Sequence, residues 1–468
     1  MNKNRELAKN TMILTIGKLC TQFVSFLLLP LYTSILNTND YGVVDLFATY
    51  VSLLMPVVCF QLDQGLFRFM LDCRENDEEI KSLFSSLFSV VIIQSIIFAT
   101  IFGMASIFMS SQYKMYLLLN VILSVFSGFL MQFARGLGRM MTYAVSSFIT
   151  ATSTVIFNVI FLVVFNWGAD GMFRATLAGL ILNVTFLFFR LKIYKYFDYS
   201  LFNKKKVYEV LKYSVPLIPN QISGWVLTAS DRTLVSFFIG VAANGLYAIA
   251  YKFSGLVATF YGFFNMAWVE TVSLHFDEND KEEYLSETIQ LALGLFASVC
   301  LGIIAIMPFA FPIMINSKFN EAYYQIPILL IAVVFQILVG LLSAIYLAEK
   351  KSMVIAKTTI LGAVINFLVD IVFISKIGLY AASLSTLISY ASVAIYRAYD
   401  IRKIVTLKWN KRFVVSLIIM FLFVLIAYYS KIIIFEVIAL VLTILYAFTI
   451  NKDFLVKIWK SSLKIRKK

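Results

Sequence analysis

This chain of 468 residues has little of what metal centres and disulfide scaffolds require. It contains four cysteines, seven prolines and one histidine, and 14% of its residues are charged. The cysteines are far apart in the sequence and form no CxxC pair, and His275 is the one imidazole. We therefore expect no metal site, no disulfide framework and no cofactor.

The chain also lacks a polar segment long enough to fold as an enzymatic domain. The longest, at about residues 190–212 and 397–412, are short loops. Asp277 and Asp280 come nearest to a catalytic pair, but they belong to an acidic run that is typical of a solvated loop. We therefore predict no catalytic residues and no enzyme activity.

The net charge of +14 is not concentrated in a basic domain with interleaved aromatic residues. Most of the basic residues instead lie beside apolar stretches. A nucleic acid partner is therefore not expected, and anionic phospholipids fit this charge distribution better.

Hydrophobic residues are what the chain has in excess. They make up 60% of the sequence, and the mean hydropathy is +0.85. We count about fourteen apolar stretches between residues 11 and 450, and most have the ~20 residues that cross ~30 Å of hydrocarbon as a helix. The first stretch, residues 11–36, has no small-residue cleavage site at its end, so we expect it to remain as the first helix. The sequence predicts an all-α polytopic membrane protein.

Lys and Arg gather in alternate gaps between the apolar stretches. The gaps on the other side contain few of them, namely Lys114, Lys318, Lys376 and Lys431. Because the side rich in Lys and Arg is normally cytoplasmic, we predict that both termini lie in the cytoplasm. Residues 451–468 alternate basic with apolar side chains, which favours an amphipathic tail on the inner leaflet.

The chain contains an internal repeat. Gly42 matches Gly245, and Asn158 matches Asn366, at nearly the same separation. Six stretches, an even number, separate the repeats, so both halves enter the membrane from the same side and the repeat is parallel. The cavity of a duplicated transporter usually lies between its halves. The predicted division is two six-helix lobes, two extra helices and a tail, at residues 1–200, 201–412, 413–450 and 451–468.

Polar and charged residues inside the apolar stretches are the candidate functional residues. A charge at the centre of a membrane helix costs about 2.5–3.5 kcal/mol on insertion scales, so something must compensate for it. Deep cations suit an anionic ligand such as a lipid diphosphate. The candidate substrate-binding residues are Lys18, Asn220, Gln221, Arg232 and Lys252, and the candidate ion-coupling or orienting residues are Asp45, Asp231 and Asp370. Asp45, like Arg174, lies near a stretch end, where a structural ion pair or snorkelling explains it equally well.

Several short segments carry a resemblance to a known family. They are Leu29–Gly42, Asp231–Lys252 and Gly378–Ala382 after Asn366. With these segments, its length and its duplication, the chain resembles the Wzx-type polysaccharide and O-antigen repeat-unit flippases. These belong to the polysaccharide transporter family of the multidrug/oligosaccharidyl-lipid/polysaccharide (MOP) flippase superfamily. The resemblance spans essentially the whole chain and implies a MATE-like fold.

The resemblance implies translocation of undecaprenyl-diphosphate-linked oligosaccharide repeat units, by alternating access, from the inner to the outer leaflet of the bacterial cytoplasmic membrane. Such a flippase serves capsule, O-antigen (lipopolysaccharide) or exopolysaccharide biosynthesis, where a polysaccharide polymerase and a chain-length regulator would be its partners. Lys18, Arg232 and Lys252 would hold the diphosphate. Asp231 would orient Arg232 or take part in H⁺ or Na⁺ coupling, for which Asp370 is the second candidate.

Other functions remain open from the sequence. A lipid II flippase and a cation-coupled multidrug exporter belong to the same superfamily. The exporter has twelve helices, and the lipid II flippase is expected to have more arginine in its early helices, where this chain has Lys18. An integral-membrane polysaccharide polymerase or acyltransferase belongs to another class and would need an externally accessible catalytic pair.

Overall fold

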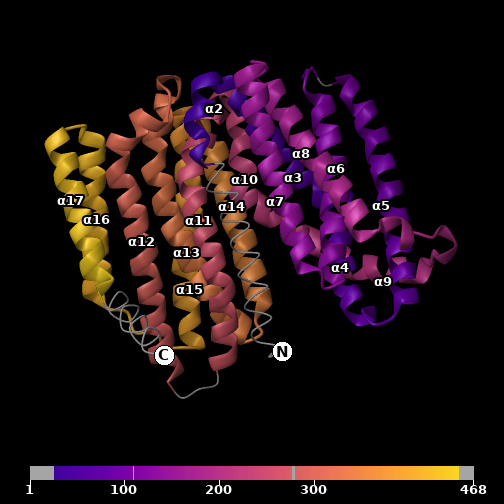
Figure 1. Cartoon of the computed structure of the whole chain (residues 1–468). Coiled ribbons are helices and arrows are strands. Elements are labelled where there is room, and N and C mark those ends of the chain that lie inside the picture. Colours follow the sequence, from indigo (N-terminus) through magenta and orange to yellow (C-terminus); the bar gives the residue numbers. More distant parts are fainter. Residues whose placement is uncertain (1–25, 109, 277–279, 453–468) are drawn as a thin grey trace, which may run out of the picture. The chain divides into compact units, whose positions relative to one another are not determined.

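The computed structural model describes residues 26–108, 110–276 and 280–452, in which helices are joined by short loops and no strand occurs (Figure 1). Lys18, most of the expected first helix and the tail at 453–468 lie outside the described residues. The chain divides into two units, Met1–Trp225 and Val226–Lys468. The boundary falls within one helix, and the expected lobe boundary at residue 200 falls in the short helix Tyr199–Leu201.

Eight α-helices of the first unit precede the boundary helix among the described residues. These are α2 (Leu29–Ile35), α3 (Thr38–Val58), α4 (Leu62–Cys73), α5 (Asp77–Ala105), α6 (Lys114–Gly136), α7 (Met140–Val159) and α8 (Gly168–Leu191), and α9 (Lys204–Ser214) follows as a short amphipathic helix. A π-helical turn, η2 (Ile160–Val164), continues α7.

The boundary helix and the second unit complete the fold. They contain α10 (Ile218–Phe238), α11 (Val241–His275), α12 (Lys281–Met314), η6 (Ser317–Gln325), α13 (Ile326–Ala348), α14 (Ser352–Ile377), α15 (Leu379–Asp400), α16 (Lys411–Ser430) and α17 (Ile433–Ile450). The two extra C-terminal helices are α16 and α17, and both pack on α12.

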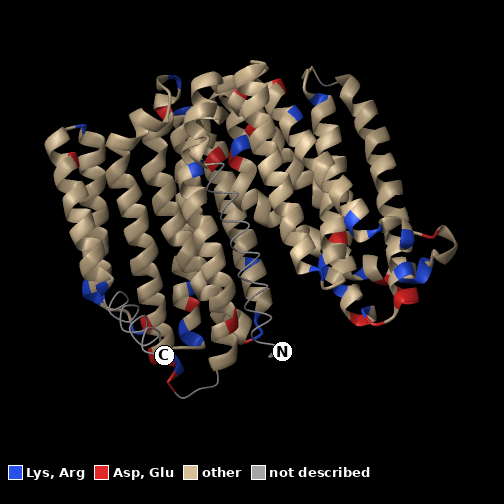
Figure 2. Ribbon diagram, in the orientation of Figure 1, with Lys and Arg blue, Asp and Glu red and all other residues tan. Residues whose placement is uncertain are grey.

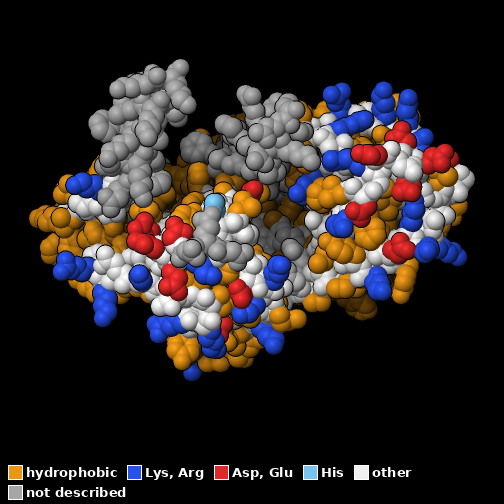
Figure 3. Space-filling view, turned by 90° about the horizontal axis from the view of Figure 1, so that it is seen from below, with side chains coloured by type: hydrophobic (Ala, Val, Ile, Leu, Met, Phe, Trp, Pro, Cys, Tyr) orange, Lys and Arg blue, Asp and Glu red, His pale blue; other side chains and the backbone are white. Residues whose placement is uncertain are grey.

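Eleven of the described helical segments are long and apolar enough to span a membrane. Helices α10 and α11 are also long enough, at 21 and 35 residues, but they carry more polar side chains. In each unit the charged residues gather near the ends of the helices, while most of the helix length is uncharged (Figure 2). In each unit the lower ends of the helices carry many Lys and Arg side chains (Figure 3). The prediction of an all-α, multi-pass membrane protein is confirmed.

Asparagine side chains cap the N-termini of four of the α-helices. Asn37, Asn76, Asn203 and Asn410 each accept hydrogen bonds from backbone N–H groups in the first turn of α3, α5, α9 and α16. A helix leaves its first N–H groups without partners, and such a cap contributes about 1 kcal/mol. These caps fix where the chain leaves a loop and enters a span.

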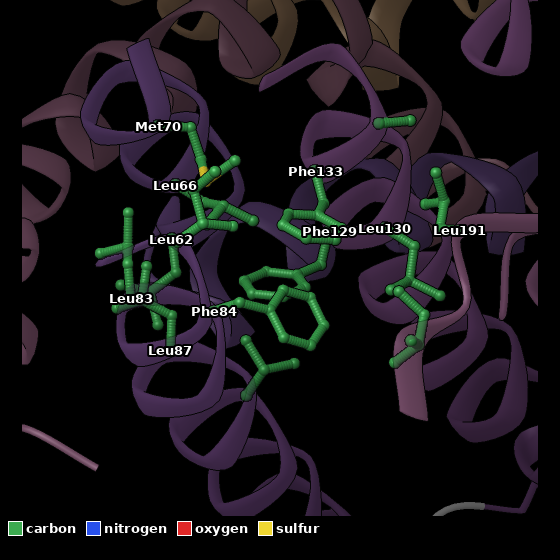
Figure 4. Close-up of a cluster of buried hydrophobic side chains, with 14 of the residues drawn as sticks. Leu62, Leu66, Met70, Leu83, Phe84, Leu87, Phe129, Leu130, Phe133 and Leu191 are labelled. Atoms are coloured by element: carbon green, nitrogen blue, oxygen red, sulfur yellow. The ribbon is translucent and has the colours of Figure 1, made fainter. Parts of the chain in front are cut away.

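The first unit has an aromatic core in which α4, α5 and α6 meet (Figure 4). The ring of Phe84 lies 4.3 Å from that of Phe133, measured between centroids. Two glycines let α4 pack tightly here. A Cβ on Gly136 of α6 would lie 2.7 Å from the Cβ of Met70, and one on Gly65 would lie 2.5 Å from Cγ1 of Val210 on α9. Helix α4 is therefore held between α6 and α9.

The second unit contains a fully buried arginine that the sequence analysis did not single out. Arg397 on α15 is 1% exposed. Its Nε and Nη2 donate to Oγ1 of Thr358 at 2.9 and 2.6 Å, and Nη1 donates to the carbonyl of Val339 at 3.1 Å and to Ser343. Nη2 also reaches the carbonyl of Ile355 at 3.2 Å. One guanidinium group therefore joins α13, α14 and α15.

We expect Arg397→Lys to destabilise the second unit, because a lysine ammonium cannot reproduce the planar fork that serves three helices. Acceptors left without donors cost about 1–3 kcal/mol each, so the unfolding temperature of the purified protein should fall by several degrees. Arg402→Lys, at an exposed position on the segment after α15, is the matched control. Equal unfolding temperatures for the two variants would contradict this role for Arg397.

Candidate functional site

Two of the predicted aspartates come together inside the second unit. Asp231 on α10 is 2% exposed, and Asp370 on α14 is fully buried. The Asp370 carboxyl group lies close enough to that of Asp231 to interact with it by charge. Sequence analysis proposed both residues separately, and the structure makes them one site.

The carboxylate of Asp231 is held by hydroxyl groups from two neighbouring helices. Tyr247 on α11 donates its hydroxyl to Oδ2 at 2.7 Å, and Thr386 on α15 donates to the same oxygen at 2.6 Å. Hydrogen bonds to an ionised acceptor are the stronger ones in proteins. Asp231 is therefore fixed in one orientation relative to α11 and α15.

The other oxygens of the pair have no donor. Among the described residues, no hydrogen bond reaches Oδ1 of Asp231 or either carboxylate oxygen of Asp370. Asn366, one helical turn before Asp370, donates to Ser385 at 3.2 Å and accepts from Ser230 at 3.3 Å, which surrounds the pair with further oxygen atoms. Buried carboxylates without donors are costly unless a cation or a proton neutralises them.

The remaining predicted residues of the second unit are Arg232 and Lys252. The guanidinium carbon of Arg232 lies 4.3 Å from the ring centroid of Tyr251, and its Nη1 donates to the carbonyl of Thr228 at 3.3 Å. Lys252, on the same helix as Tyr251, is exposed. A cation–π contact with Tyr251 therefore helps to place Arg232.

The first unit contains the other candidates. Asn220 and Gln221 are exposed in the first turn of α10, and Asp45 is half-buried on α3. Lys18 lies outside the described residues. Asp45 and the exposed pair on α10 therefore stay predictions.

Sequence analysis missed Thr386, although a signal for it exists. Within α15, Ser383, Ser385, Thr386 and Ser389 follow one another closely in an otherwise apolar span, and all four are buried. Hydroxyls so dense in a membrane helix indicate a polar surface facing other helices. Tyr247 appeared only as part of a short motif.

The second unit contains a cavity beside α13. It has a volume of about 700 Å³ and is lined by apolar side chains of α12, α13 and α16, among them Leu293, Phe335, Leu338, Phe421 and Leu422. Lys411 and Trp409 lie at the start of α16, where the cavity lining begins. Its lining suits a hydrocarbon chain and not a polar ligand.

Comparison with solved structures identifies the fold. The lipid II flippase MurJ in an inward closed conformation matches 96% of this chain and 99% of its own, with a TM-score of 0.69 at 17% identity. An inward-facing multidrug resistance MATE family transporter of the MOP superfamily matches 82% of this chain and 95% of its own, with a TM-score of 0.67 at 13% identity. The chain therefore has a MATE-like fold.

The family follows from the sequence. The model of the family described as "Polysaccharide biosynthesis protein" matches residues 7–273, more than half of the chain, so this chain belongs to that family. The Probable low-salt glycan biosynthesis flippase Agl15 of Haloferax volcanii is 21% identical over 211 residues. That alignment spans 44% of each chain, so the chain matches less than half the length of this relative.

We expect the two hydroxyls on Asp231 to act as a unit in stability measurements. Tyr247→Phe and Thr386→Val each remove one donor to the same carboxylate oxygen, so each should lower the free energy of unfolding by about 1.5–3 kcal/mol. The double variant should lose less than the sum of the two, because residues that share a partner are coupled. Tyr446→Phe, which loses a neutral contact to Ser416 at 3.0 Å, is the control. Strictly additive losses would contradict the shared site.

Proposed function

We propose that this protein is a flippase that moves undecaprenyl-diphosphate-linked oligosaccharide repeat units from the inner to the outer leaflet of the bacterial cytoplasmic membrane, for capsule, O-antigen or exopolysaccharide biosynthesis. The observation that carries the proposal is membership of the polysaccharide biosynthesis protein family, combined with a MATE-like fold. Both termini are proposed to be cytoplasmic, as the distribution of Lys and Arg indicates.

The proposed mechanism is alternating access without covalent chemistry. Superfamily members with this fold are named as transporters and flippases. A substrate that is anionic at one end and hydrocarbon at the other needs two unlike surfaces. Lys18, Arg232 and Lys252 are the proposed ligands of the diphosphate, with Asn220 and Gln221 beside the sugar. The apolar cavity along α16 supplies a surface that fits a polyprenyl chain.

We further propose that Asp231 and Asp370 bind the coupling ion, which is H⁺ or Na⁺. Buried oxygen atoms are the ligands that hard cations prefer, and two adjacent carboxylates in a water-poor interior can also share one proton. The carboxylate oxygens of the pair that accept no hydrogen bond among the described residues are the proposed ligands for either ion. Asp45 in the first unit is proposed as a secondary orienting residue.

Depleting the protein in its host tests the proposed function. We expect a complete lipid-linked repeat unit to accumulate, by mass spectrometry, while the surface polysaccharide is lost. Complementation by Gln substitutions at Lys18, Arg232 and Lys252 should fail, whereas the native chain should restore the polymer. Full export by the triple variant would overturn the binding assignment.

Other outcomes of the same depletion would overturn the proposal itself. Accumulation of lipid II would indicate a lipid II flippase. Unchanged lipid pools with altered drug resistance would indicate a multidrug exporter. Repeat units that reach the outer surface but are not polymerised would indicate an integral-membrane polymerase, and a missing acyl group on them would indicate an acyltransferase.

The ion-coupling assignment predicts a response of stability to ions. A ligand that binds the folded state stabilises it by about 1.4 kcal/mol when its concentration is about tenfold above its Kd. The unfolding temperature of the native protein should therefore respond to Na⁺ or to pH, and that of Asp370→Asn should respond much less. Asp400→Asn, which loses a carboxylate already bonded to Lys403 at 2.8 Å, is the control. Equal responses in native protein and Asp370→Asn would exclude the pair as the ion site.

A further inference from the structure

Three arginines surround the turn that joins α6 to α7 in the first unit. Arg74 follows the last residue of α4, Arg135 lies in the last turn of α6, and Arg139 directly precedes α7. None of the three has a carboxylate within 4.0 Å among the residues that the structure describes, whereas Arg68 on the neighbouring α4 pairs with Asp72 at 2.7 Å. These three arginines therefore form no salt bridge with any residue that the structure describes.

The guanidinium group of Arg74 is hydrogen-bonded to backbone carbonyl groups. Its Nε donates to the carbonyl of Gly136 at 2.9 Å, and its Nη2 donates to that of Arg135 at 3.3 Å. Gly138 has a φ of +75°, and a Cβ there would lie 3.2 Å from the Nη2 atom of Arg74. Arg74 thus satisfies the last carbonyls of α6 and holds the turn closed, which leaves Arg135 and Arg139 for another role.

The guanidinium group of Arg135 is held in place, but one of its hydrogen-bond donors has no acceptor among the described residues. Its guanidinium carbon lies 3.9 Å from the ring centroid of Phe67 on α4, so the aromatic face orients the group. Its Nε is buried and has no acceptor among the described residues. One turn earlier, Oε1 of Gln132 is also buried and has no donor. Favourable interaction with the helix dipole explains a cation at the end of α6. It does not explain why Nε of Arg135 and Oε1 of Gln132 are buried without a hydrogen-bond partner among the described residues.

We propose that Arg135 and Arg139 form a binding site for the phosphate of a lipid head group at the end of α6 and α7. A guanidinium group presents a planar fork of donors that matches phosphate oxygens, and a fork held by an aromatic ring loses little freedom on binding. Gln132 adds an acceptor for a hydroxyl of the same head group. The distribution of Lys and Arg predicts that this turn faces the cytoplasm, where a lipid-linked substrate would be loaded.

This inference rests on the proposed function for its choice of lipid, because a lipid diphosphate and an ordinary anionic phospholipid share the phosphate group. The full chain in nanodiscs, examined by native mass spectrometry, can separate the two. The probes are undecaprenyl diphosphate and phosphatidylglycerol. The test variant is Arg135→Gln/Arg139→Gln, and the matched control is Arg68→Gln/Lys205→Gln, which removes the same charge from exposed positions of the same unit.

We expect the test variant to bind undecaprenyl diphosphate at least about tenfold more weakly, since hydrogen bonds between charged groups are lost, while the control changes little. Loss confined to undecaprenyl diphosphate identifies the site with the substrate, and equal loss for both probes identifies a general phosphate site. Unchanged binding, or the same loss in the control, overturns the inference. Arg135→Lys keeps the positive charge but lacks the planar fork of donors, so it should lose part of the affinity for undecaprenyl diphosphate. This variant provides the test if the double variant does not fold.

Different experimental results would show that the arginine site is wrong and that the proposed function is wrong. If the native protein binds undecaprenyl diphosphate and the test variant binds it equally, only the arginine site is wrong. If the native protein does not bind it and depletion leaves the lipid-linked repeats unchanged, the flippase proposal is wrong.

Discussion

The cost of burying polar groups away from water is the constraint on which this structure depends. In hydrocarbon each polar group must find a partner inside the protein. Arg397 meets this demand completely, because its guanidinium group donates to residues of α13 and α14 while it belongs to α15. The cluster holds three helices at fixed separations. A buried cation here is a structural element whose charge is spread over several hydroxyl and carbonyl oxygens.

Among the described residues, the same constraint is only partly met at Asp231 and Asp370. Asp231 receives hydroxyl donors from Tyr247 and Thr386 on one oxygen, which fixes its position, yet three oxygens of the pair have no donor among the described residues. A purely structural pair would gain stability from replacement by apolar residues. The proposal of an ion site rests on this contrast, because a bound ion would supply the missing partner.

The sequence predicts the membrane helices well because hydropathy and length alone determine them, and it predicts Asp231 and Asp370 because charges inside apolar stretches are rare. It does not predict that these two meet, since their separation in sequence says nothing about the packing of α10 on α14. Arg397 was missed because it lies near the end of an apolar stretch, where a basic residue is ordinary. The orphaned Nε of Arg135 was also beyond prediction, because only side-chain geometry shows which donors lack an acceptor.

Helix α10 is held by side-chain hydrogen bonds at two places along its length. In its first half Trp225 donates its indole N–H to the carbonyl of Thr49 in the first unit at 3.1 Å. Two turns later Asp231 is held by residues of the second unit. An α-helix is stiff over that distance, so the hydrogen bond of Trp225 and those of Asp231 restrict one and the same helix. A polar side chain that must find a partner in a water-poor interior thereby also limits how the helix carrying it can shift.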